Sequence, residues 1–207
     1  HDHVETLFAS IASVQAQRDT DWELVVIGDG APDRSREIVE GFGQRDPRIS
    51  YVSHPKGERF GEVYRDPVIR NSDATYICHL GDDDLWHETH LESMTALLDQ
   101  ADWAVSGDLR ITPPGAATWR FGNLAHPPFR AAAARTSGHF LFGTLNGVAV
   151  LTSAYLVLET SWEAAPVSSG SDVFMWLKYI RNRDMRLACS ARATHVKFQA
   201  GGVRAAF

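Results

Sequence analysis

The sequence lacks an excess of positive charge: 20 Lys and Arg residues face 26 Asp and Glu residues, and the formal net charge is −6. A broad nucleic-acid interface needs clustered Lys and Arg side chains that neutralise phosphates. The charge balance therefore argues against nucleic acid as the partner. An acidic protein can still bind a phosphate-bearing ligand, and a bound divalent cation would supply the local positive charge.

Cysteine is also scarce, with only Cys78 and Cys189, both in apolar stretches typical of strands. We expect two buried, reduced thiols. Because there is neither a cysteine cluster nor a signal peptide, the sequence predicts a cytoplasmic protein. No apolar run approaches the ~20 residues of a membrane span, so we expect no transmembrane segment. Action at a membrane surface stays open, since a domain without a span can work there.

The first half of the chain alternates between helical and strand-like patterns. Asp2 and Glu5 have the spacing of a capping box, and apolar positions then recur with helical period to about residue 18. Further alternation predicts an α/β fold, with a mostly parallel sheet and helices on both faces. The expected elements are strands near 23–27, 48–52 and 76–80, a strand that starts at 103–105, and helices beginning at Asp33 and covering about 88–99.

The second half follows a different pattern. Residues 113–142 contain four prolines and the run Ala131–Ala134, which predicts a long irregular segment. We expect order to resume over 145–151, followed by a helix from about 172 to 183 and strands near 186–190 and 194–198. The whole chain, 1–207, is expected to form a single domain.

Acidic turns follow two of the expected strands. Gly28-Asp29-Gly30 comes after the strand ending at Ile27, and Asp82-Asp83-Asp84 comes soon after Leu80. In an open α/β sheet, ligands bind at the carboxyl ends of the strands. Two like charges ~4 Å apart repel by about 4 kcal/mol at an effective dielectric of ~20, and a hard divalent cation relieves that repulsion. The three adjacent aspartates at 82–84 therefore favour a cation site. The alternative is a solvated turn that caps the following helix.

Several motifs, in order, resemble glycosyltransferase family 2. They are Ser13-Val-Gln-Ala-Gln17, Trp22-Glu-Leu-Val-Val-Ile-Gly-Asp-Gly30 with Asp33, Asp46-Pro-Arg-Ile49, Ala74-Thr-Tyr-Ile77 and Leu80-Gly-Asp-Asp-Asp-Leu-Trp86 with Leu91. The resemblance covers about the first 100 residues and implies the GT-A fold, with a Rossmann-like sheet. The family's first strand is not found before the first helix, so we expect an exposed sheet edge or an apolar slot.

The resemblance implies a metal site that holds Mn²⁺ or Mg²⁺. Laid on the family's pattern, Asp83 is the metal ligand and Asp84 the second, with His195 near the metal or the diphosphate. Gly81 stands where the family has its first Asp, and an alternative register uses Asp82 and Asp84 as the ligands. His87 and His90 also flank the acidic run, but imidazole-rich sites suit Zn²⁺, which nothing else in the sequence supports.

The resemblance also implies how the substrates bind. Asp29 and Gly30 would bind the nucleotide sugar at its base, Asp82 would lie near the ribose, and Arg65 would approach the phosphates. Asp172, at the start of a helix, would be the general base, although Ser171 replaces a residue that is commonly Glu. As a carboxylate there, it would also be stabilised by the helix dipole, so the alternative is a simple cap.

Together these residues predict an inverting glycosyltransferase that moves a sugar from a nucleotide-diphosphate donor to an acceptor hydroxyl. Residues 1–110 would bind the nucleotide and residues 111–207 the acceptor, which is a glycan, a lipid-linked molecule or a small molecule. The alternatives are a non-catalytic GT-A-like binding module, which the departures at Gly81 and Ser171 would favour, and a sugar nucleotidyltransferase, which would carry a Gly-rich basic loop. A dehalogenase-like phosphatase fits badly, because Ala31 stands where that class needs a second Asp after Asp29.

Overall fold

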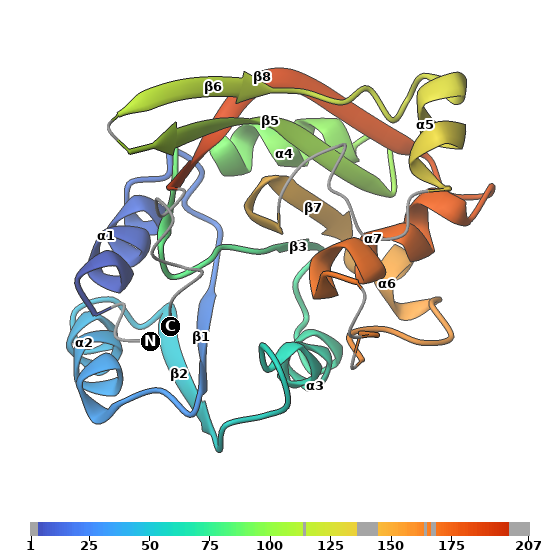
Figure 1. Cartoon of the computed structure of the whole chain (residues 1–207). Helices are drawn as coiled ribbons and strands as arrows, with labels where there is room; N and C mark the ends of the chain where they lie inside the picture. The colour runs from blue at the N-terminus through green and yellow to red at the C-terminus, as the bar shows by residue number, and fades with distance from the viewer. Residues whose placement is uncertain (1–3, 114, 136–144, 164, 167–168, 199–207) are drawn as a thin grey trace.

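A computed structural model describes residues 4–113, 115–135, 145–163, 165–166 and 169–198, arranged as two sheets with helices packed on them (Figure 1). The strands are β1 (Leu24–Asp29), β2 (Ile49–His54), β3 (Tyr76–Cys78), β4 (Asp84–Trp86), β5 (Trp103–Thr112), β6 (Ala116–Arg120), β7 (Val148–Leu151) and β8 (Leu187–Phe198). The α-helices are α1 (Val4–Gln15), α2 (Asp33–Gly43), α3 (Arg65–Arg70), α4 (His90–Leu98), α5 (Pro127–Ala133), α6 (Thr152–Leu156) and α7 (Ser171–Arg181). Two 3₁₀ turns, η1 (Glu62–Tyr64) and η2 (Leu145–Gly147), complete the described elements. Asp2, the expected helix cap, lies outside the described residues.

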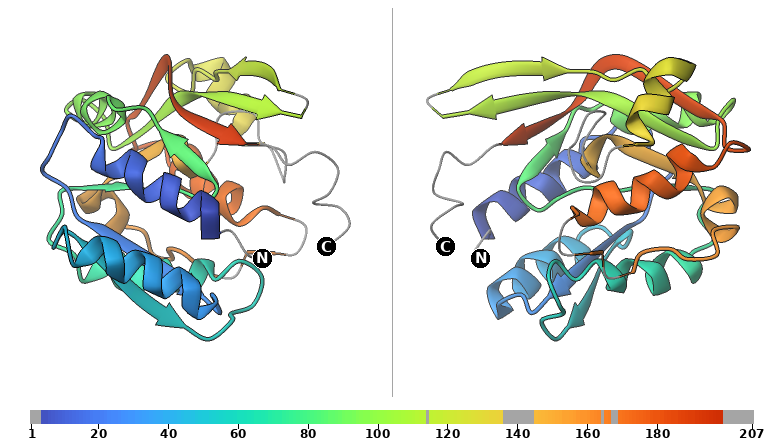
Figure 2. Two further views of the ribbon diagram at one scale, coloured as in Figure 1. Left: turned by 90° about the vertical axis from the view of Figure 1, so that its left-hand side faces the viewer. Right: turned by 45° about the vertical axis from the view of Figure 1, so that its right-hand side comes forward.

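The first sheet is a parallel pair, β1 and β2, in register from Leu24 opposite Ile49 to Asp29 opposite His54. Helices α1 and α2 pack side by side against it (Figure 2). Their apolar faces and the strands share one core cluster, built around Ile11, Val39 and Phe42. The cluster forms because these positions recur with helical period and lie next to a β-branched strand.

The second sheet has the order β3-β7-β5-β8-β4, with β6 paired to β5. The expectation of a mostly parallel sheet is wrong here: only β5 and β8 run parallel, and the other four pairings are antiparallel. The alternation of apolar runs and helices does not fix strand direction. β5 extends from the expected strand start at 103–105 to Thr112, and the antiparallel β6 begins at Ala116. Connections this short join antiparallel strands.

Helices cover both faces of this sheet, as expected. Alternate residues of a strand point to opposite faces, and on β5 Trp103 packs in a cluster with Trp176 of α7, whereas Ala104 packs with Met94 of α4. The larger core lies on the α7 side, where Trp103, Trp176 and Tyr179 are all buried.

The segment expected to be irregular contains regular structure. β6 lies at Ala116–Arg120 and α5 at Pro127–Ala133, while 136–142 fall outside the described residues. Pro127 and Pro128 do not prevent a helix here, because they occupy the first turn of α5, where a backbone N–H has no partner within the helix. The alanine run then continues that helix, since alanine has the highest helix propensity.

The two sheets are separate in the described part of the chain: β1 pairs with β2 alone and β3 with β7 alone. Helix α1 lies between the sheets, with Ile11 in the cluster of the first and Val14 in a cluster with Trp86 of β4. The hydroxyl of Ser10 also donates to the backbone oxygen of Asp84 at 2.7 Å, so α1 contacts both sheets.

Both cysteines are free, one in β3 and one in β8, and desolvation raises the pKa of the Cys78 thiol to about 12. Among the described residues, no helix is both long enough and apolar enough to cross a membrane.

Candidate functional site

Asp29 ends β1, and the loop that follows β2 binds its carboxylate. The backbone N–H of Gly57 donates to Asp29 Oδ1 at 2.6 Å, and the Lys56 ammonium forms an ion pair with Oδ2. Gly30 has φ +62° and packs against Lys56, so a side chain there would be strained and would also clash. The carboxylate is therefore oriented at the carboxyl end of the first sheet.

The three aspartates of the acidic run have different environments. Asp82 is exposed, Asp83 is half-buried and Asp84 is buried, with 1% of its surface accessible. Lys197 Nζ contacts Asp84 Oδ2 at 2.8 Å, the N–H of Phe198 donates to Oδ1 at 2.9 Å, and the amide of Asn146 donates to Oδ2. Desolvation raises the pKa of Asp84, and Lys197 opposes that rise. Asp84 thus links β4, β8 and η2 at the first position of β4.

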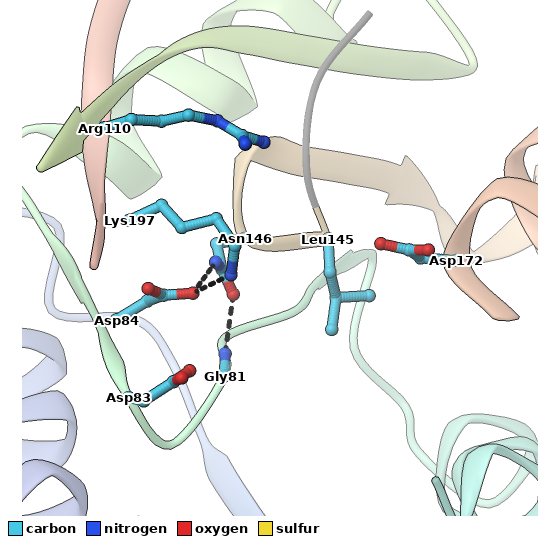
Figure 3. A pocket seen from close by; sticks show the side chains of 8 residues that line it. All are labelled: Gly81, Asp83, Asp84, Arg110, Leu145, Asn146, Asp172 and Lys197. Atoms are coloured by element: carbon cyan, nitrogen blue, oxygen red, sulfur yellow. Dashed lines mark hydrogen bonds and ion pairs between the residues drawn. The ribbon is translucent and has the colours of Figure 1, made fainter. Parts of the chain in front are cut away.

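A pocket of about 230 Å³ opens beside this turn (Figure 3). Its acidic lining residues are Asp83, Asp84 and Asp172, and its basic ones are Arg110 and Lys197. Gly81, Leu145 and Asn146 complete the lining. The volume is smaller than the ~300–1,000 Å³ typical of sites for drug-sized ligands, which suits one sugar unit or one phosphate group rather than a whole nucleotide sugar.

Asp172 lies across the pocket from Asp83, in the first turn of α7 (Figure 3). Its Oδ1 accepts the N–H of Val173 at 2.9 Å. Desolvation raises the pKa of Asp172, while this N–H and the nearby Arg65 oppose the rise. The result is a carboxylate fixed in direction by the helix start and more basic than an exposed aspartate.

Arg65 connects the two acidic regions. Its guanidinium lies over the ring of Trp162, 4.4 Å from the centroid, and its Nη1 is buried with no hydrogen-bond partner in the described residues. Desolvation lowers the pKa of Arg65, and attraction to Asp172, Glu62 and Asp29 opposes this. The Arg65 charge therefore acts both on Asp29 at the end of β1 and on Asp172 in α7.

A second arginine holds the loop before α7. Arg59 is the one described non-glycine residue with a positive φ, 62°. Its guanidinium donates to the carbonyls of Pro166 and Ser169, both at 2.9 Å, and to that of Ala165. The loop that contacts Asp29 is therefore tied to the loop that leads to Asp172.

The structure does not bring His195 to Asp83. The His195 ring, 1% exposed, packs against Gly147, and its Nδ1 lies 3.3 Å from Ser106 Oγ. It is not among the described residues that line the pocket. Searched over the described ranges, the chain holds no group of three or more His, Cys, Asp or Glu side chains placed to bind a metal together.

The buried His195 predicts acid sensitivity. Desolvation lowers its pKa to about 4 from the usual 6.5. The unfolded chain therefore binds a proton as the pH falls below 6.5 while the folded chain does not, so stability is lost between pH 6.5 and about 4. We expect the thermal midpoint of a His195→Gln variant to fall less over this range than that of the wild-type protein. An unchanged pH dependence of the midpoint would contradict this assignment.

Three lining residues with polar side chains, Arg110, Asn146 and Lys197, were not expected from the sequence. Arg110 and Lys197 reach the pocket because β5 and β8 pair across a long separation, with Arg110 opposite Lys197 in register. Asn146 lies in η2, which contacts both of these strands. The one local signal is the strand alternation that puts His195 and Lys197 on the same face of β8.

Sequence comparison shows which proteins the chain is similar to. It is 30% identical over 97 residues to EpsJ of Bacillus subtilis (strain 168), described as an uncharacterized glycosyltransferase, covering 47% of this chain and 28% of that protein. It is 25% identical over 105 residues to a putative teichuronic acid biosynthesis glycosyltransferase, TuaG, of the same organism, covering 51% of this chain and 40% of that one. The chain thus spans less than half of either relative.

Solved structures share the fold. The S. aureus protein TarS, residues 1–349 in complex with UDP-GlcNAc, superposes with a TM-score of 0.68 at 17% identity, covering 97% of this chain and 57% of that one. The mannosyltransferase PcManGT from Pyrobaculum calidifontis, in complex with GDP-Man and Mn²⁺, gives 0.64 at 14% identity, covering 95% and 54%. The likeness confirms the GT-A fold.

A model of the family described as glycosyl transferase family 2 matches residues 3–152, which include both acidic turns. Because this match covers well over half of the 207 residues, the chain belongs to glycosyl transferase family 2.

Proposed function

We propose that this chain is the catalytic domain of a cation-dependent, inverting glycosyltransferase that transfers a sugar from a nucleoside-diphosphate donor to an acceptor hydroxyl. One observation carries the proposal: Asp83 and Asp172 line the same pocket from opposite walls (Figure 3). The first can hold a cation and the second can accept a proton, and the small pocket between them suits the transferred sugar.

The donor would extend from this pocket towards the first sheet. Arg65 interacts with both Asp29 and Asp172, and its unpartnered, buried Nη1 suits a phosphate oxygen. Asp29 and Gly30 would then bind the base end of the nucleotide, and Asp82 the ribose. The similar structures that contain UDP-GlcNAc or GDP-Man support a donor of this class.

The residues present fit a divalent cation with few protein ligands. Mg²⁺ is commonly held by one or two carboxylates plus substrate phosphates, so Asp83 together with donor oxygens would suffice. Asp84 is less suited to be the second ligand, since Lys197, Asn146 and Phe198 already occupy its two oxygens, and His195 is buried elsewhere. Mn²⁺ or Mg²⁺ at Asp83 would stabilise the charge of the departing diphosphate.

In the proposed mechanism, Asp172 takes the proton of the acceptor hydroxyl as its oxygen attacks the anomeric carbon. Its raised pKa makes it a better base than an exposed aspartate. The new carbon–oxygen bond forms on the face opposite the departing diphosphate, so the configuration at that carbon inverts. Arg65 would position the donor phosphates. Arg59 would position the loop that leads to the general base, Asp172.

An Asp83→Ala variant tests the cation site. In the wild-type protein, a nucleoside diphosphate with Mn²⁺ at 100 times its dissociation constant should stabilise the fold by about 2.7 kcal/mol, which raises the thermal midpoint by roughly 5–10 °C in a domain of this size. We expect Asp83→Ala to lose the Mn²⁺-dependent part of this shift for UDP, GDP and dTDP alike. An Asp99→Ala variant, at an exposed carboxylate after α4, is the matched control.

A wild-type protein that no nucleoside diphosphate stabilises would contradict the proposed donor, and an unchanged Mn²⁺-dependent shift in Asp83→Ala would contradict the assigned ligand. The alternative of a non-catalytic binding module predicts donor binding without donor hydrolysis. An assay of UDP or GDP release in the presence of Mn²⁺ separates the two.

A further inference from the structure

The pocket wall away from Asp83 carries a surplus of positive charge. On β5, Asp108 has no exposed side-chain surface and is contacted by two guanidinium groups. Arg110 Nε donates to Asp108 Oδ2 at 2.8 Å, and Arg120 donates through Nε at 3.2 Å and Nη2 at 3.0 Å. One carboxylate and two guanidiniums sum to a single positive charge.

The two ionisable side chains on β8 next to this cluster, His195 and Lys197, do not offset its charge. Lys197, the register partner of Arg110 on β8, is already paired with Asp84. His195, which interacts with Asp108 and both arginines, has its pKa lowered to about 4 mainly by desolvation, so it is neutral near pH 7. For Asp108, burial raises the pKa but the hydrogen bonds from Arg120 and Arg110 outweigh it, so the carboxylate stays ionised.

Arg110 directs this charge into the pocket. It is one of the lining residues, and Figure 3 shows its guanidinium extending over the cavity, with Lys197 between it and Asp83. Its Nε is used by Asp108, whereas no described residue accepts a hydrogen bond from its two terminal nitrogens. A guanidinium presents these donors in a planar fork that matches a carboxylate or phosphate.

We propose that Arg110 binds an anionic group of the acceptor, so that the acceptor is a sugar or polyol bearing a phosphate or a carboxylate near its reacting hydroxyl. This rests on the proposed function, in which the donor diphosphate occupies the Asp83 wall and leaves the Arg110 wall to the acceptor. The anion neutralises the net positive charge of Asp108, Arg110 and Arg120. It also places the reacting hydroxyl of the acceptor next to Asp172.

Matched pairs of small acceptors test this by titration of the full chain, with and without Mn²⁺ and UDP. The phosphate arm compares glycerol 1-phosphate with glycerol, and the carboxylate arm compares methyl glucuronide with methyl glucoside. We expect the wild-type protein to bind the anionic member of at least one pair about tenfold or more tightly, the range of a charge-assisted hydrogen bond. Arg110→Gln should abolish that preference, and Arg34→Gln, at an exposed position on α2, should keep it.

The fold of Arg110→Gln should persist because Arg120 still pairs with Asp108, and thermal unfolding checks this. A preference that survives in Arg110→Gln, or no preference in the wild-type protein in either arm, would overturn the proposal. A loss of UDP affinity in Arg110→Gln as large as the loss of anion preference would also overturn it, by assigning Arg110 to the donor. A separate titration measures binding of UDP, GDP and dTDP to the wild-type protein. If none of them binds, the proposed function is contradicted, whatever the result for the acceptors.

Discussion

Replacing Asp172 with Asn is expected to lower sugar transfer by roughly 10²–10⁴-fold, the usual contribution of a general base. The amide cannot accept the acceptor proton, yet it keeps the shape of the side chain at the start of α7. Affinity for a nucleoside diphosphate with Mn²⁺ should not fall, because Asp172 lies across the pocket from Asp83 and the loss of its negative charge cannot weaken phosphate binding at Arg65. Steady-state kinetics and calorimetric binding measure the two quantities separately.

The pH profile gives an independent readout of the same group. A base must be ionised to act, so the wild-type rate should rise with pH through the pKa of Asp172, which burial places above the usual range of aspartate. This acidic limb should be absent from the residual activity of Asp172→Asn. Ser171→Ala, one residue earlier in the same helix, is the control for a disturbed α7. Near-normal transfer by Asp172→Asn would assign the base to another group.

Replacing Asp84 with Ala is expected to destabilise the fold by about 3 kcal/mol, at the lower end of the range for breaking a buried ion pair. The variant leaves the N–H of Phe198 and the amide of Asn146 without their acceptor, whereas Lys197, 24% exposed, can turn towards water. Chemical denaturation measures the change. Asp82→Ala, at an exposed neighbour in the same turn, should change stability by no more than about 0.5 kcal/mol.

The Asp84→Ala variant also tests whether Asp84 has a structural role or binds the cation. A normal stability for Asp84→Ala, accompanied by loss of the Mn²⁺-dependent donor shift, would mean that Asp84 binds the cation and that Asp83 does not suffice. The structure favours the opposite outcome, because the protein already neutralises Asp84.

Local signals in the sequence identified the elements that carry the site. The apolar run before Gly28 predicts β1, and the periodic apolar positions after Gly170 predict α7, because both patterns depend on neighbours in the chain. The strand-and-turn placement of Asp29 and Asp83, and the helix start at Asp172, follow from those same patterns. Family membership was predictable because several motifs occur in order, which one motif alone would not establish.

Long-range pairing could not be predicted in the same way. β8 is one continuous strand, although the sequence suggested two short ones, and it lies between β5 and β4. That position delivers Lys197 to Asp84 and buries His195, so it decides which aspartate is neutralised and removes the histidine from the expected metal site. Nothing near Asp84 in the sequence specifies Lys197, more than a hundred residues away.

Helix α1 has a consequence for how a donor would be held. Since it packs on β1 and β2 through one part of its length and on β4 through another, it sets the spacing between the turn at Asp29 and the turn at Asp83. A donor that contacts both turns would therefore link the two sheets a second time, in addition to α1. Substitutions of buried α1 residues would then lower the affinity for the donor, although no α1 side chain contacts it.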